Sequence, residues 1–107
     1  MTYKEVKTLL SSAGIPVVYY QWPEGQAPEP PYLVFYFPGD NDFKADDQNY
    51  TKIRELTVEL YTDQKDFALE ETVESILSPL VYSRNEAYLD TERMFMVSYE
   101  TEVLING

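Results

Sequence analysis

The segment from Lys52 to Tyr61 alternates apolar and polar residues, and this pattern constrains the fold more than any other feature of the chain. Arg54, Leu56, Val58 and Leu60 fall on one side of an extended chain, and Glu55, Thr57 and Glu59 fall on the other. Such alternation is typical of a strand with one buried and one solvated face. The segment from Arg93 to Ile105 shows the same pattern, with Phe95, Val97, Tyr99, Thr101 and Val103 on one face. The first of these segments is therefore predicted to be a strand with one buried and one solvated face, and the second shares its pattern.

Two segments carry apolar residues at helical spacing, and they can cover that buried face. The first is predicted from Tyr3 to Ala13, because Thr2 and Glu5 have capping-box spacing and Pro16 forbids continuation. The second follows the polar turn at 62–66 and closes at Pro79. Its apolar positions are Leu69, Val73, Ile76, Leu77 and Leu80.

Three more segments read as strands because they are rich in β-branched and aromatic residues or follow turn signals: 17–20, 32–37 and 81–89. We expect Tyr32–Phe37 to be a central strand buried on both faces. The expected class is α+β, in the order α-β-β-β-α-β-β. It has a mostly antiparallel sheet of about five strands with two helices packed on one face. Residues 1–107 suit a single domain.

Two loops separate these elements and are candidates for contacts with other molecules. The proline-rich stretch Trp22–Pro31 is expected to be an extended or ordered loop. The acidic loop from Asp40 to Asn49 is the candidate interaction loop, because long loops in compact domains are often functional. Its candidate residues are Asp40, Asp42, Phe43, Asp46 and Asp47.

The acidic loop begins like a calcium-binding EF-hand loop, but the match fails after three residues. Lys44 and Ala45 stand where that loop needs Asp or Asn and then Gly. Two interpretations stay open. One is a loose divalent-ion site formed by the four aspartates of the loop, and the favoured one is a solvated acidic loop without a metal.

Exposed tyrosine and tryptophan are favoured at protein interfaces, and three aromatic residues are candidates for that role: Tyr20, Trp22 and Tyr36. The adjacent pairs 19–20 and 36–37 must point to opposite faces of a strand. Some of these rings are therefore exposed unless both faces are covered. For Trp22 the competing interpretation is packing over its own sheet.

Composition excludes several classes of function. The chain has no His and no Cys, so it can form no Ser-His-Asp triad, no thiolate nucleophile and no zinc site of the usual kind. It also has no phosphate-binding glycine motif. We therefore expect no enzymatic activity and no cofactor. An enzyme that uses carboxylates or a metal ion is the third interpretation, after the two binding functions below.

The net charge of −11 argues against nucleic-acid binding and against anionic membranes. Disordered chains of such charge are poor in aromatic residues, whereas this one has 10 Tyr, 5 Phe and 1 Trp. The polar start lacks the apolar stretch of a signal peptide, which predicts the cytoplasm as the compartment.

Several short sequence motifs follow one another in an order that resembles a known group of proteins. They are an LLxxxGIPV-like helix exit, EGQAPEPPY, an aromatic strand ending in PG, DNDFKADDQNY and KIRELTVELYTDQKD. This order resembles small structural proteins of tailed phages and prophages of Gram-positive bacteria, encoded near the head–tail junction. The element order is also similar to that of tail terminator and tail-to-head joining proteins. The resemblance spans Lys4 to about Val103 and involves no catalytic motif.

The resemblance implies a virion assembly protein that forms or joins a ring at the head-proximal end of the tail. It implies self-association and contacts with tail-tube or head-connector proteins, after assembly in the host cytoplasm. DNA would pass an acidic lumen without specific binding, and the acidic loop is the candidate lumen or partner surface. The alternative function is an acidic DNA mimic that inhibits a DNA-binding protein. Glu70, Glu71 and Glu74, with the acidic loop, would supply part of its phosphate-like charge.

Overall fold

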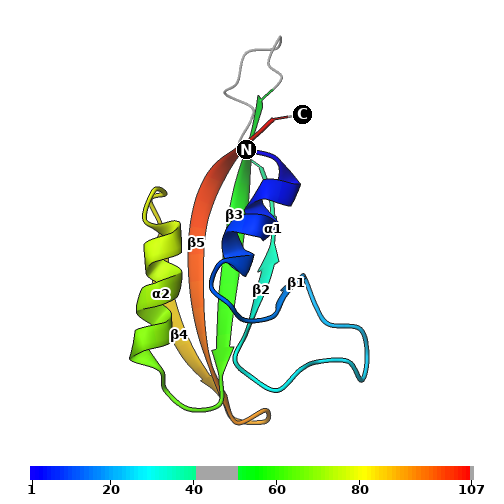
Figure 1. Cartoon of the computed structure of the whole chain (residues 1–107), viewed down its shortest axis with the longest axis vertical. Coiled ribbons are helices and arrows are strands. Elements are labelled where there is room, and N and C mark those ends of the chain that lie inside the picture. The colour runs from blue at the N-terminus through cyan, green and yellow to red at the C-terminus, as the bar shows by residue number, and fades with distance from the viewer. Residues whose placement is uncertain (41–50, 107) are drawn as a thin grey trace.

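The protein is built on one five-stranded sheet with two helices on the same face (Figure 1). The computed structural model describes residues 1–40 and 51–106. Its elements follow the predicted order: α1 (Tyr3–Ser11), β1 (Val17–Tyr19), β2 (Tyr32–Tyr36), β3 (Thr51–Thr62), α2 (Phe67–Leu77), β4 (Ser83–Leu89) and β5 (Met94–Asn106). The α+β class is confirmed.

The sheet has the strand order β1-β2-β3-β5-β4 and is mixed, because one of its pairings is parallel. Three pairings, β2–β3, β3–β5 and β4–β5, are antiparallel as expected. The exception is β1–β2, where Val17 lies opposite Leu33 and Tyr19 opposite Phe35. A parallel pair needs a crossover of about a dozen residues. The proline-rich segment 20–31 provides this return path.

The helices and one face of the sheet enclose the hydrophobic core. Val6 and Leu10 of α1, and Val73 and Leu77 of α2, are fully buried against the sheet. The sheet contributes Leu33, Phe35, Leu56, Val58, Leu60, Val97, Tyr99, Val103 and Ile105. The buried faces predicted for 52–61 and 93–105 are thus confirmed. We call this side the helix face, and the opposite side the open face.

Both helices begin as their sequences predict. Thr2 and Glu5 form the capping box, in which each side chain accepts a hydrogen bond from the other residue's backbone N–H. Asp66 caps α2 by accepting a hydrogen bond from the N–H of Leu69 over 3.0 Å. These caps give hydrogen-bond acceptors to backbone N–H groups in the first turn of each helix, which stabilises both helices.

Several element boundaries differ from the prediction by one residue, and two differ by two residues. Helix α1 ends at Ser11 and not at Ala13, because the N–H groups of Ser12, Ala13 and Gly14 bond to carbonyls three residues back. Such tightening is common in last turns. Strand β4 begins at Ser83 and not at Val81. The carbonyl of Val81 instead accepts a 2.6 Å hydrogen bond from the Thr101 hydroxyl, and the Val81 side chain is exposed.

Candidate interaction surface

The open face of the sheet carries a band of tyrosines around one carboxylate. In the register of β2 and β3, Val34 lies opposite Glu59, Tyr32 opposite Tyr61 and Tyr36 opposite Thr57. Because side chains alternate along a strand, these residues share the face that the helices leave uncovered. The open face is therefore where the two central strands place their polar and aromatic side chains together.

Glu59 holds two tyrosines of this band in fixed positions. The Tyr36 hydroxyl donates to Glu59 Oε2 over 2.9 Å, and the Tyr61 hydroxyl donates to Oε1 over 2.7 Å. Partial burial and the hydrogen bond to the Glu59 carboxylate raise the pKa of Tyr36 to about 12. The same two causes raise the pKa of Tyr61. Both phenols are thus neutral at physiological pH, and both carboxylate oxygens of Glu59 are occupied.

Direct ring contacts join further residues to this band. Tyr20 packs on Tyr36 with ring centroids 5.4 Å apart. Tyr32 stacks on Tyr61 at 5.1 Å, and Trp22 meets Tyr32 edge-on at 5.7 Å. The structure therefore brings all three predicted interface aromatics to one surface. We call its ring residues the open-face aromatics: Tyr20, Trp22, Tyr32, Tyr36 and Tyr61.

The predicted division of adjacent aromatics between opposite faces is confirmed. Tyr36 contacts Tyr20 on the open face, whereas Phe37 contacts Tyr3 and Tyr19 on the helix face. Sequence reasoning missed Tyr61 and Glu59 as parts of the surface. Their alternation with Leu60 was a usable signal, but only the β2–β3 register shows that they lie beside Tyr36.

Tyr20 is the most accessible of the open-face aromatics. Its side chain is 64% exposed, and its backbone φ of 69° lies in the left-handed region. A bulky residue there is strained by roughly 1–3 kcal/mol, and strained residues cluster at functional sites. An exposed aromatic ring on a strained backbone is therefore the part of this surface that most resembles a binding group.

Trp22 takes the competing position predicted for it, packed over its own sheet. It is half-buried against Tyr32. Its indole Nε1 is buried, and among the described residues no hydrogen-bond acceptor reaches it. An orphaned buried donor costs about 1–3 kcal/mol. Trp22 thus packs against Tyr32 within the aromatic band, and the more exposed rings of the band are better placed to contact a partner.

Of the predicted interaction loop, the structure describes Asp40 alone. Asp40 pairs with Arg54 both through the backbone and through a 2.7 Å ion pair, and Arg54 Nε donates to the Tyr3 hydroxyl over 3.1 Å. The other predicted residues, Asp42, Phe43, Asp46 and Asp47, lie outside the described residues. Within 1–40 and 51–106 no group of three potential metal ligands comes together. The divalent-ion hypothesis for the loop is therefore not tested.

Two of the three carboxylates of helix α2, those of Glu70 and Glu74, are used within the molecule, whereas Glu71 is exposed. Glu70 is buried and pairs with Lys65 and with Arg84, whose Nη2 lies 2.7 Å from Glu70 Oε1. Glu74 accepts a 2.8 Å hydrogen bond from the Tyr99 hydroxyl and lies 3.5 Å from Arg84 Nε. A DNA mimic needs such carboxylates to be free and exposed. This arrangement weighs against that alternative.

Among the described residues, no helix is long and apolar enough to cross a membrane. A scan against protein-family models finds no match for this sequence, and a search of curated proteins finds none either.

The fold itself has a counterpart among solved structures. A chain from the virion of the native gene transfer agent (GTA) particle superposes with a TM-score of 0.62. The match covers 96% of this chain and 88% of that chain, at 14% sequence identity. The two proteins therefore share a fold over nearly their whole lengths.

Proposed function

We propose that this protein is a structural component of a tailed-phage-type virion. It acts at the head–tail junction as a tail terminator or tail completion protein and works by protein–protein contacts rather than catalysis. The fold shared with a chain of a gene transfer agent virion supports the virion part of this proposal. The order of sequence motifs, which resembles head–tail junction proteins, supports the finer assignment.

The observation that carries the binding role is the open face itself. A sheet face that is not covered by helices normally bears scattered polar side chains. Here it bears five contacting aromatic rings, of which Tyr20 is largely exposed, Tyr32 is buried and the other three are half-buried. Tyrosine and tryptophan are enriched where proteins meet, because they bury a large area at low entropic cost. The surface is thus suited to a partner protein in an assembly.

The net charge of −11 is consistent with a conduit for DNA. In a ring, acidic groups facing the lumen would repel phosphates, so DNA would slide past without binding. Self-association of so acidic a chain must rely on local complementarity and on aromatic contacts, because the overall charge opposes it.

Deletion of the gene from the genome that encodes it tests this function directly. Electron microscopy of the particles should then show overlong tails if the protein is a terminator, or normal-length tails without heads if it joins the two. Complementation with the wild-type gene is the control. Particles of normal length with heads attached, formed without this protein, would contradict the proposal.

A further inference from the structure

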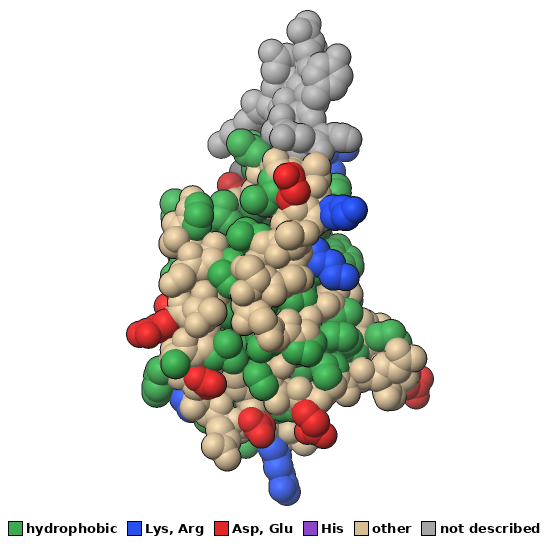
Figure 2. Space-filling model, viewed as in Figure 1, with side chains coloured by type: hydrophobic (Ala, Val, Ile, Leu, Met, Phe, Trp, Pro, Cys, Tyr) green, Lys and Arg blue, Asp and Glu red, His purple; other side chains and the backbone are tan. Residues whose placement is uncertain are grey.

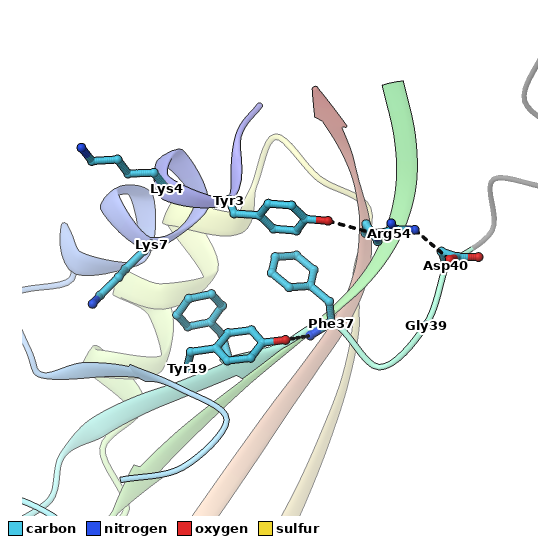
Figure 3. A pocket seen from close by; sticks show the side chains of 9 residues that line it. Tyr3, Lys4, Lys7, Tyr19, Phe37, Gly39, Asp40 and Arg54 are labelled. Carbon is cyan, nitrogen blue, oxygen red and sulfur yellow. Dashed lines mark hydrogen bonds and ion pairs between the residues drawn. The ribbon is translucent and has the colours of Figure 1, made fainter. Parts of the chain in front are cut away.

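A hollow lies on the other side of the sheet from the open-face aromatics, and the proposed function does not use it. It is a hollow of about 610 Å³ between α1 and the ends of β1, β2 and β3. Figure 3 shows its wall as a column of three rings, Tyr3, Phe37 and Tyr19. The ring centroids of Tyr3 and Phe37 are 5.0 Å apart, and those of Phe37 and Tyr19 are 6.0 Å apart.

Two of the three rings of this wall are exposed, and the third, Phe37, is half-buried. Tyr3 is 47% exposed and Tyr19 is 49% exposed. Their hydroxyls are engaged at the ends of the column, where Tyr3 accepts from Arg54 Nε and Tyr19 accepts from the N–H of Phe37. What remains open to a ligand is the flat, apolar part of the rings. An aromatic side chain would pack against such a wall edge-on or offset-stacked.

The rim of the hollow is basic in an otherwise acidic molecule. Of the eight Lys and Arg residues of the chain, Lys4, Lys7 and Arg54 line it. Figure 2 shows basic side chains beside α1 on this face. Arg54 neutralises Asp40, and within the described residues neither lysine pairs with a carboxylate. Two cationic groups at the rim are thus available to an incoming acidic group.

The ligand that fits is an acidic segment with one aromatic ring, and the chain contains such a segment. The sequence Asp42-Phe43-Lys44-Ala45-Asp46-Asp47 contains three aspartates and one phenylalanine. We infer that the hollow of one copy binds residues 42–47 of a second copy, with Phe43 on the aromatic wall and the aspartates facing Lys4 and Lys7. This inference rests on the proposed function, because it names the contact by which copies would associate.

The charges also determine the type of contact. If two copies met through the same rim, Lys4 and Lys7 would face their own counterparts and repel. A hollow that binds a different, acidic segment gives a head-to-tail contact, and head-to-tail contacts close into rings when the rotation allows it. Each copy would offer one hollow and one segment.

A peptide with the sequence of residues 40–49 tests the inference on the full-length protein. We expect it to shift the amide NMR signals of Tyr3, Lys7, Tyr19 and Phe37, with affinity that falls as salt rises. A peptide carrying Phe43→Ala should bind at least tenfold more weakly. Binding that leaves these signals unmoved, or that tolerates Phe43→Ala, would overturn the inference.

Matched charge reversals in the protein locate the site. The double variant Lys4→Glu/Lys7→Glu should lose peptide binding at least tenfold, and it should fold because both side chains are exposed. The control Lys52→Glu/Arg93→Glu carries the same net charge outside the hollow and should bind like wild type. Equal losses in both variants would mean general repulsion and would overturn the inference.

A variant in which a Gly-Ser linker replaces residues 41–50 shows whether the hollow binds the segment of its own copy or that of a second copy. If, at concentrations where the wild type is monomeric, the peptide binds this variant but not the wild type, each copy fills its own hollow and the second-copy inference is wrong. Failure to bind either protein also refutes it. None of these results depends on tail length, so they stand apart from the gene-deletion test of the proposed function.

Discussion

The two lateral edges of the sheet differ in whether their functional groups are paired within the chain or exposed. At the α2–β4 edge, Glu70 is buried and balanced by Lys65 and Arg84. At the β1–β2 edge, Tyr20 is left exposed on a strained backbone. Its ring packs on Tyr36, whose hydroxyl donates to Glu59 of the central strand β3. Charged groups that pair within the chain stabilise the fold. An aromatic ring that stays exposed on a strained backbone is available to a partner. The difference separates a structural edge from a binding edge.

The largest effect is expected from breaking the structural edge. Arg84→Met removes one cation from buried Glu70 and the nearest cation from Glu74. Removing one partner of a buried pair costs about 3–5 kcal/mol; because Lys65 remains, we expect about 2–3 kcal/mol here. Urea unfolding monitored by circular dichroism measures it. Arg93→Met, in the exposed turn, is the control and should change stability by less than about 0.5 kcal/mol. Equal stability of the two variants would show that the ion pairs contribute nothing.

The hydrogen bonds of Glu59 predict how tyrosines ionise. Burial raises the pKa values of Tyr32, Tyr36, Tyr61 and Tyr99, and Glu59 adds to the shift of Tyr36 and Tyr61. These four phenols should therefore ionise late in an ultraviolet titration. Glu59→Gln removes the negative acceptor and should lower the pKa of Tyr36 from about 12 toward its ordinary value of 10. An unchanged late titration in this variant would show that burial alone causes the shift.

The same raised pKa predicts a direction for stability at high pH. The folded state holds the Tyr36 proton more tightly than the unfolded state, so this contribution is fully present below pH 10. It is lost as pH rises through about 12. Urea midpoints measured between pH 9 and pH 12 should fall for the wild type and fall less for Glu59→Gln, each compared with its own value at pH 9. Parallel curves would contradict the proposed role of Glu59.

The smallest stability effect is expected at the binding edge. Tyr20→Asp loses a ring contact with Tyr36, but Asp tolerates the left-handed backbone better than Tyr does. We expect the two changes to offset, leaving the free energy of unfolding within about 1 kcal/mol of the wild-type value. Thermal unfolding checks it. A loss of more than 2 kcal/mol would make Tyr20 a structural residue.

Much of this architecture can be predicted from the sequence, because its signals are local. The alternation in 52–61 and the capping residues Thr2 and Asp66 each act within a few positions. The parallel pairing of β1 could not be predicted, since nothing in Val17–Tyr19 records the direction of its neighbour. The candidate site could be predicted only in part, because local signals do not show which strands pair. Tyr20 and Tyr36 stand out as aromatic, but the role of Glu59 depends on a register set by long-range packing.

The central claim is that the open-face aromatics form the surface by which this protein joins an assembly. Complementation of the gene deletion with Tyr20→Asp and with Tyr88→Asp tests it most directly. Both tyrosines are exposed, at 64% and 49%, but Tyr88 packs against Phe95 on the helix face. We predict that Tyr88→Asp restores tails of normal length with heads attached in electron micrographs, and that Tyr20→Asp does not. Full restoration by Tyr20→Asp would contradict the claim.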